Sequence, residues 1–75
     1  MSNVISLSKE GYAKLAARLQ YLETTGREEN RKEIEIAKGF GDLSENAEYT
    51  AAREAQARIE GEILDIQDKL QHCVI

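Results

Sequence analysis

Two glycines, Gly39 and Gly41, separate two long stretches of this sequence in which apolar residues recur at helical spacing. Glycine just past a helix end accepts the left-handed backbone conformation that closes many helices, so the pair predicts that a first helix ends here. Apolar residues of the first stretch are three or four positions apart, at Tyr12, Leu15, Leu19 and Leu22. Those of the second stretch lie at Ala52, Ala55, Ile59, Ile63, Ile66, Leu70 and Cys73. Such spacing is typical of coiled-coil helices with one buried face.

The short connection determines how these two helices are arranged. Two helices joined by a few residues must pack side by side and run in opposite directions. The predicted fold is therefore all-α, a long antiparallel two-helix coiled-coil hairpin that forms one domain, 1–75. We expect a first helix over about 8–39, a turn over about 40–44 and a second helix over about 45–73.

Local signals add detail to this hairpin. Ser8 is a preferred N-cap for the first helix, and Asp42 or Ser44 is expected to cap the second. Two threonines and Gly26 weaken the middle of the first helix, so we expect a loosened or kinked stretch there. Beyond it the apolar positions resume out of step with the first seam, at Ile34 and Ala37, with Ile36 and Phe40 as further candidates.

Length and composition exclude several classes of protein. The chain has 75 residues, enough for one small unit, and its net charge of −4 offers no overall basic footprint for duplex nucleic acid. Its single cysteine, Cys73, allows no internal disulfide, which fits a reducing cytoplasm. No apolar run reaches membrane-spanning length, and residues 1–5 lack the pattern of a secretion signal. We expect a soluble, cytoplasmic protein with no membrane partner, whose isolated hairpin self-associates along its apolar seam.

The turn carries two carboxylates, Asp42 and Glu45, three positions apart at the start of the second helix. At this spacing both side chains can point to one side, where they could help to bind a divalent cation. Mg²⁺ prefers six oxygen ligands, so the pair suggests ligands donated to a metal that another protein already holds. The plainer alternative is a capping box, in which each side chain satisfies a backbone N–H at the helix start. The residues alone leave both interpretations open.

Basic residues gather on the half of the hairpin nearest the turn, at Arg31, Lys32, Lys38 and Arg53. In the predicted hairpin Arg31 and Arg53 lie at similar heights on the two arms. These side chains could form a small patch for a phosphate backbone. Alternatively, they could pair on the exposed surface with nearby glutamates, namely Glu33, Glu35, Glu48 or Glu54.

Structural roles are expected for most other polar and aromatic residues. Phe40 and Tyr49 are expected to cover the small core of the turn, with contact to a partner as the alternative. His72 is a lone histidine with no cluster of metal ligands to join. Cys73 is expected to pack in the seam. The sequence contains no Ser-His-Asp or Cys-His arrangement and no glycine-rich phosphate loop.

The turn and the start of the second helix read Gly41-Asp42-Leu43-Ser44-Glu45-Asn46-Ala47-Glu48-Tyr49, followed by Thr50-Ala51-Ala52-Arg53-Glu54-Ala55-Gln56. This run closely resembles the signature of the bacterial Gre transcript-cleavage factors, and it is closer to the GreA branch than to the GreB branch. The similarity extends from about Leu7 to Val74. It includes Ser8, Gly11 and Leu15 in the first arm and Glu60, Gly61, Asp65 and Ile66 in the second.

The resemblance implies a domain that acts in transcription elongation. Gre factors have an N-terminal antiparallel coiled coil, which enters the secondary channel of RNA polymerase, and a C-terminal domain of FKBP-like fold, which docks on the polymerase. Carried over by motif, Asp42 would coordinate the second catalytic Mg²⁺, and Glu45 would orient the attacking or coordinated water. The polymerase would hold most of the Mg²⁺ shell and would itself hydrolyse the 3′ end of backtracked RNA. The chain would stimulate this cleavage without being an enzyme by itself.

Tip support is expected from further residues of this motif, Gly41, Leu43, Asn46 and Tyr49. From the basic patch near the turn, contact with RNA or polymerase is expected at Arg31, Lys38 and Arg53. The sequence ends at Ile75, about where the FKBP-like domain of the family begins, so we expect an isolated N-terminal domain with reduced affinity for polymerase.

Two other functions stay open on the sequence alone. A Gre-like inhibitor would occupy the channel without stimulating cleavage, and lost or crowded tip acids would favour it. A structural coiled-coil adaptor would use Asp42 and Glu45 only to cap a helix.

Overall fold

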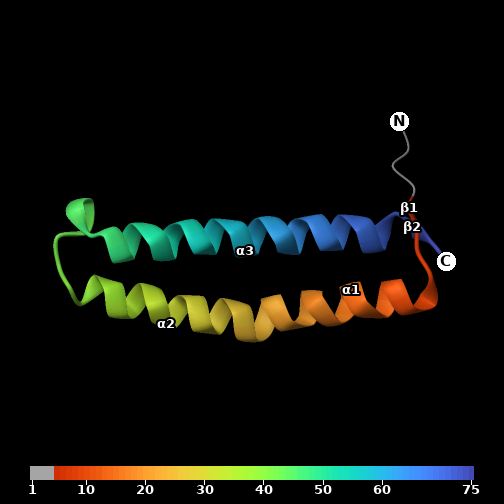
Figure 1. Cartoon of the computed structure of the whole chain (residues 1–75), viewed down its shortest axis with the longest axis horizontal. Helices are drawn as coiled ribbons and strands as arrows, with labels where there is room; N and C mark the ends of the chain where they lie inside the picture. Colours follow the sequence, from red (N-terminus) through yellow and green to blue (C-terminus); the bar gives the residue numbers. More distant parts are fainter. Residues whose placement is uncertain (1–4) are drawn as a thin grey trace.

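The computed structural model describes residues 5–75, which form a thin helical hairpin measuring 49 × 26 × 12 Å (Figure 1). The first arm consists of α1 (Lys9–Tyr21), the π-helical turn η1 (Leu22–Gly26) and α2 (Arg27–Lys38). The return arm consists of the short 3₁₀ turn η2 (Leu43–Glu45) and α3 (Ala47–Gln71). The predicted hairpin of two long helical arms is thus confirmed. Residues 1–4, part of the stretch searched for a secretion signal, lie outside the described residues.

The first arm begins as its sequence indicates. The hydroxyl oxygen of Ser8 accepts a hydrogen bond from the backbone N–H of Gly11 at 2.9 Å, which confirms Ser8 as the N-cap of α1. This bond satisfies one of the N–H groups that the first helical turn leaves without a partner.

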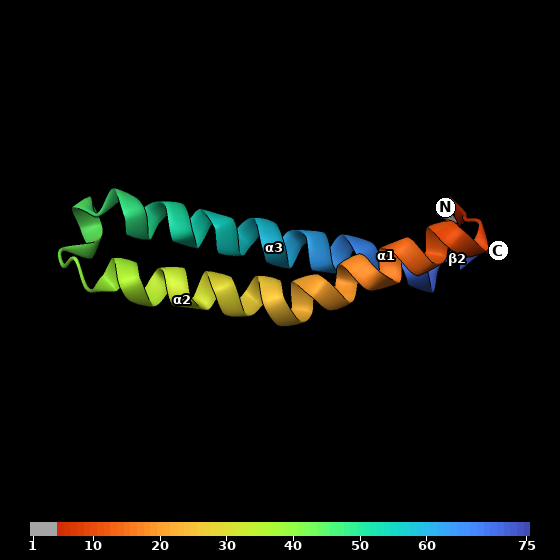
Figure 2. The same ribbon diagram turned by 60° about the horizontal axis from the view of Figure 1, so that its bottom comes forward.

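The middle of the first arm is loosened where the sequence predicts it. Leu22–Gly26 forms a single π-helical turn between α1 and α2, and the arm changes direction there (Figure 2). A π turn accommodates about one residue more than an α turn. It therefore shifts the phase of the helix, which explains why the apolar positions after Gly26 are out of step with those before it. Leu22 and Gly26 are both buried against the return arm.

The core runs along the seam between the arms. Leu22, Ile63 and Ile66 are its buried centre. The side chains that pack against this centre are Leu15, Leu19, Ile59 and Leu70. Nearer the turn, the buried apolar residues are Ile34, Ala37 and Ala52. The predicted seam is thus confirmed over most of its length.

Two predicted seam candidates face solvent instead. Ile36 is 64% exposed and Phe40 is 66% exposed, so Phe40 does not cover the core of the turn. In α2, Asn30 also faces the return arm and is buried. Its side-chain amide donates to the carbonyl oxygen of Ala52 at 3.0 Å. A prediction of the core from apolar residues misses Asn30, because its side chain is polar. A buried amide is nevertheless well tolerated when it has a hydrogen-bond partner.

Polar contacts also join the arms at their surface. Arg18 makes a two-bond ion pair with Glu62, at 2.9 and 3.1 Å. Arg27 makes the same kind of pair with Glu60, at 2.8 Å for both bonds. Planar guanidinium and carboxylate groups favour this two-bond geometry. These pairs connect the first arm to the return arm on either side of η1.

The open end of the hairpin contains a feature that the all-α prediction missed. β1 (Ile5–Ser6) and β2 (Cys73–Val74) pair as a two-stranded parallel sheet, with Ile5 opposite Cys73. The backbone N–H of Leu7 extends the ladder by donating to the carbonyl oxygen of Val74 at 2.9 Å. Cys73 therefore lies in a strand and not, as predicted, in the last turn of the helical seam. Two-residue strands are too short to produce an alternating pattern in the sequence.

None of the helices among the described residues is both long and apolar enough to span a membrane.

Candidate functional site at the tip

The backbone of the tip turns sharply within a few residues. Gly41 adopts a φ of +80°, which suits glycine, and Asp42 follows with a φ of +37°. No other non-glycine among residues 5–75 has a positive φ. Because the left-handed region is strained for side chains other than glycine, and aspartate is among those that tolerate it best, this turn holds Asp42 in an unusual conformation.

The two acidic residues are brought together by the η2 turn. The backbone N–H of Glu45 donates to the carbonyl oxygen of Asp42 at 3.1 Å. The carboxylate of Asp42 accepts a hydrogen bond from the hydroxyl of Ser44 at 2.9 Å. Both acidic side chains are exposed. The turn therefore presents two carboxylates to solvent at the end of the rod opposite the pair of strands β1 and β2 (Figure 1).

The predicted caps of the second helix are wrong. The N-cap of α3 is Asn46, whose side-chain oxygen accepts from the backbone N–H of Tyr49 at 2.9 Å. Asp42 makes no capping bond from its side chain, since it precedes η2 and not α3. The Asp42–Glu45 capping box is therefore not formed, because η2 and Asn46 separate the pair from the first turn of α3.

Asn46 also joins the two arms beneath the tip. Its side-chain amide donates to the carbonyl oxygen of Ala37 at 2.7 Å and to that of Gly41 at 3.2 Å. The side chain is buried, and each of its polar groups has a partner. Of the other residues expected to support the tip, Tyr49 is half-buried and Leu43 is 43% exposed. The sequence indicated that Asn46 belongs to the tip but gave no sign of these bonds across the turn.

The chemistry of the two carboxylates fits a hard cation. Asp and Glu oxygens are the side-chain ligands that Mg²⁺ prefers. Among the described residues, no group of three or more His, Cys, Asp or Glu side chains is arranged to hold a metal ion. A divalent cation at Asp42 and Glu45 would thus draw its remaining oxygen ligands from another molecule or from water.

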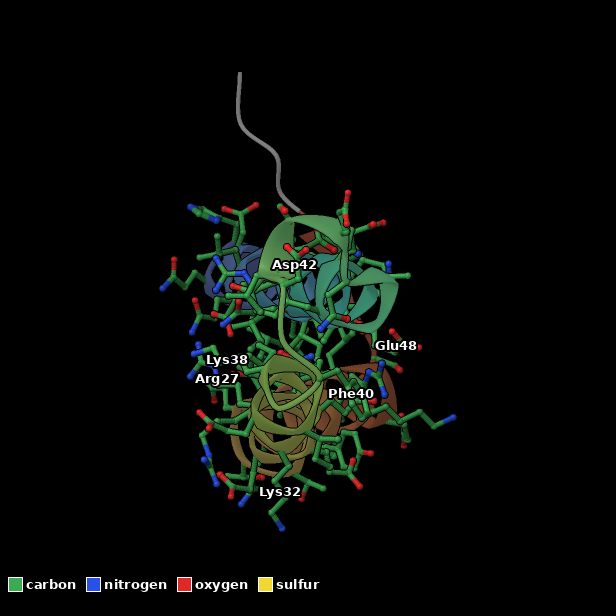
Figure 3. All side chains as sticks on the ribbon, turned by 90° about the vertical axis from the view of Figure 1, so that its left-hand side faces the viewer. Arg27, Lys32, Lys38, Phe40, Asp42 and Glu48 are labelled. Carbon is green, nitrogen blue, oxygen red and sulfur yellow. The ribbon has the colours of Figure 1, made fainter. Side chains whose placement is uncertain are left out.

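The expected basic patch lies in one groove between α2 and α3. Arg31, Lys38 and Arg53 line this groove of about 400 Å³ together with Arg27, which the sequence analysis did not include. Lys32 lies elsewhere, on the outer side of the first arm (Figure 3). The groove also contains two glutamates, Glu35 and Glu60, so its charge is mixed but predominantly positive.

Part of this basic charge is already paired. Arg31 forms a two-bond ion pair with Glu28, at 2.8 and 3.1 Å, within α2. This hydrogen-bonded guanidinium lowers the pKa of the Glu28 carboxyl below its ordinary value. Lys38 and Arg53 make no ion pair among the residues described. Arg31 is therefore engaged in a surface ion pair, whereas contact of Lys38 and Arg53 with a phosphate backbone stays a prediction.

His72 has a local role at the open end. It ends α3, and its ring Nδ1 lies 2.9 Å from the carbonyl oxygen of Asp68 and 3.1 Å from the Asp68 carboxylate. This position is far from the tip along the rod (Figure 1).

Comparison with known proteins identifies what the chain is similar to. A family model described as "Transcription elongation factor, N-terminal" matches residues 5–75. The chain is 49% identical to transcription elongation factor GreA of Nautilia profundicola over 69 residues, which are 92% of this chain and 43% of that protein. It is 47% identical to GreA of Prosthecochloris aestuarii over 75 residues, all of this chain and 47% of that protein. With GreA of Geobacillus kaustophilus the identity is 46% over 69 residues, 92% of this chain and 44% of that protein. The chain thus spans a little under half the length of these curated relatives.

Proposed function

The chain belongs to the family of GreA and GreB N-terminal domains, and from that premise we propose that it inserts its tip into RNA polymerase and stimulates cleavage of backtracked RNA. The hairpin would enter the secondary channel of the polymerase with Asp42 and Glu45 leading. In this proposal the polymerase performs the hydrolysis, and the chain is not an enzyme by itself.

One observation carries the proposal. Asp42, which directly precedes η2, and Glu45, the last residue of η2, are both exposed at the end of a rod whose longest dimension is 49 Å. They are not used to cap α3, which leaves their carboxylates available to a partner. A thin rod suits delivery of these groups into a narrow passage, because its second and third dimensions are only 26 and 12 Å.

The chemical roles are those that the resemblance to the Gre factors implies, and the residue types fit them. The carboxylate of Asp42 would contribute oxygen to the shell of a Mg²⁺ ion held mainly by the polymerase, and Glu45 would orient a water through a hydrogen bond. When bound, the ion would stabilise negative charge on the reacting phosphate and help to deprotonate the attacking water. Asn46 would hold the turn, so that the acids are positioned before binding. The hydrogen bond from Ser44 would restrict the rotation of the Asp42 side chain.

The basic groove offers a contact for the RNA. Lys38 and Arg53 line one groove close to the tip and make no ion pair among residues 5–75. Lysine and arginine contact phosphate oxygens without reading the base sequence. They would therefore help to place the 3′ end of any backtracked RNA near Asp42.

Transcript cleavage by stalled, backtracked RNA polymerase tests the proposal. The chain is added in excess with Mg²⁺, beside the Asp42→Asn, Glu45→Gln double variant. We expect stimulation by the native chain and loss of most of it, about 10²-fold or more, in the double variant, whose shape is conserved but whose charge is removed. Equal stimulation by both proteins would contradict a role for the acids.

A negative result with the native chain needs one further comparison, because the whole relatives are about twice as long. The assay is then repeated with the chain joined to the C-terminal half of a GreA relative. If the fusion also fails to stimulate cleavage, the proposed function is wrong, and a channel-blocking inhibitor or a structural adaptor becomes the better interpretation.

A further inference from the structure

A second groove lies beside the tip, on the side of the hairpin opposite the basic groove. It has a volume of about 470 Å³ and runs between α2 and α3. Its lining is mostly apolar: Ile36, Ala37 and Phe40 from the first arm, and Ala51, Ala52 and Ala55 from α3. The view along the rod from the tip shows Phe40 and Glu48 on one side and Arg27 and Lys38 on the other (Figure 3).

The shape of this groove is asymmetric. One wall carries two large side chains, Ile36 and Phe40, which are 64% and 66% exposed. The other wall is built from alanines, which leave room above the backbone of α3. An apolar side chain from a partner could lie on the alanines while Ile36 and Phe40 close over it. Exposed large apolar residues gathered in this way commonly mark a protein contact.

The position of the groove beside the tip acids indicates which protein binds in it. Phe40 is two residues before Asp42, and Glu48 is three residues after Glu45. A protein that surrounds the two tip acids must therefore also lie against the near end of the groove. In the proposed function, on which this inference rests, that protein is the RNA polymerase.

The charged residues at the rim of the groove indicate what kind of partner segment it binds. Glu33, Glu48 and Arg58 border the groove, and none of them forms an ion pair among the described residues. With two carboxylates and one guanidinium the rim is acidic on balance, so it favours lysine or arginine over the phosphates of a nucleic acid. A second copy of the chain is a poorer match, because its net charge is −4 and its basic groove is on the opposite side. A protein segment with an apolar side chain next to a basic residue fits both the lining and the rim.

We propose that this apolar groove docks on a segment of RNA polymerase that carries an apolar side chain flanked by lysine or arginine. The two grooves then have separate roles, since the basic one faces RNA and the apolar one faces protein. Contacts on opposite sides of the rod restrain its rotation about the long axis. The apolar groove contributes binding and not chemistry, because it contains no group that reaches the tip acids.

A titration of the cleavage reaction separates binding from chemistry. The rate of cleavage by backtracked polymerase is measured against the concentration of the chain, for the native protein and for the Ile36→Ser, Phe40→Ser variant. We expect the concentration for half-maximal stimulation to rise about tenfold, as for the loss of interface anchors. The rate at saturation should stay within about twofold of native, since the tip acids are unchanged.

Matched controls address the chemistry of the groove. Leu64→Ser removes a side chain that is also 66% exposed but lies in α3 away from the groove, so it should leave the titration unchanged. Glu48→Lys should raise the half-maximal concentration, whereas the same charge change at Glu54, an exposed residue of α3 that does not line the groove, should raise it less. Circular dichroism confirms that each variant keeps its helix content.

Direct binding distinguishes failure of this inference from failure of the proposed function. A dye on Cys73, at the open end, reports binding to core RNA polymerase by fluorescence anisotropy. Weaker binding by the groove variant supports the docking surface even if the native chain stimulates no cleavage. Equal binding and equal half-maximal concentrations for the native and groove-variant chains would overturn the docking surface and leave the proposed function standing. Absence of binding by both the native chain and its fusion to the C-terminal half of a GreA relative would overturn both.

Discussion

Asn46 and Asp42 together determine the conformation of the tip, although they differ in burial and in backbone conformation. Asn46 is buried and uses both ends of its amide, so that one side chain caps α3 and bonds to two carbonyl oxygens across the turn. Asp42 is exposed and has a φ of +37°, in the left-handed region that most side chains avoid. Strained backbone of this kind persists where surrounding bonds enforce it. The residue that presents the carboxylate therefore depends on the residue that anchors the turn.

Replacing Asn46 should destabilise the whole hairpin. Asn46→Ala removes the N-cap and the two hydrogen bonds that the amide donates to the carbonyl oxygens of Ala37 and Gly41, which should lower the free energy of unfolding by about 2–3 kcal/mol. Asn46→Ser keeps a capping oxygen but is too short to donate across the turn, so about half of the loss is expected. Thermal unfolding followed by circular dichroism measures both. Equal stability of the alanine and native proteins would show that these bonds contribute nothing.

At the scale of elements, the sequence predicts the long helices, whose apolar pattern repeats, and misses the short strands. The three-four spacing predicted both arms and the buried seam, because each arm repeats the pattern over several turns. The loosened stretch near Gly26 was also predictable, since threonine and glycine weaken a helix. The pair of two-residue strands was not predictable, because so short a segment carries no period. Asn30 was missed because polarity concealed a buried position that the shifted phase after η1 creates.

The π turn should behave as a one-residue insertion in an otherwise continuous helix. Deleting the exposed Thr25 should convert η1 into an α turn and keep the phase of α2, so that the seam and the Asn30–Ala52 bond are retained. We expect a folded protein with similar helix content. Deleting the exposed Ala57 from α3, where the helix is regular, should instead rotate half of the seam by about 100° and unfold the chain. Far-ultraviolet circular dichroism and thermal unfolding compare the two deletions. Unfolding by both deletions to the same extent would contradict the insertion model.

Acid should loosen the contact between the arms. Hydrogen bonding to Arg27 lowers the pKa of the Glu60 carboxyl below its ordinary 4.5, and Arg18 has the same effect on Glu62. A lowered folded-state pKa means that the stabilisation is present above about pH 4.5 and is lost as the pH falls through the folded-state value. The difference in melting temperature between native and Arg27→Gln proteins should thus be present at about pH 7 and shrink as the pH falls below about 4.5. Added salt should reduce this difference, because the pair is exposed. A difference that is independent of pH would rule out the ion pair as its source.

At the scale of the whole molecule, residues 5–75 form a rod with two exposed carboxylates at one end. The core and the strand pair hold the open end, the two arms extend from it, and the acids project beyond the last buried bond at Asn46. Along the tip half, one side is basic and the other is apolar with an acidic rim. The sequence identified the tip residues, because they form one continuous motif. It could not show that the acids are free of capping, since that depends on where α3 begins.

The most direct test of the proposed role of the tip is the Mg²⁺ dependence of transcript cleavage. Backtracked polymerase is assayed at saturating chain over a range of Mg²⁺ concentrations, with the native protein and with Asp42→Asn. If Asp42 supplies an oxygen ligand to the catalytic ion, the variant should need about tenfold or more Mg²⁺ for half-maximal cleavage, and excess Mg²⁺ should restore part of the rate. An unchanged half-maximal Mg²⁺ concentration, with the rate reduced equally at every concentration, would contradict metal coordination by Asp42.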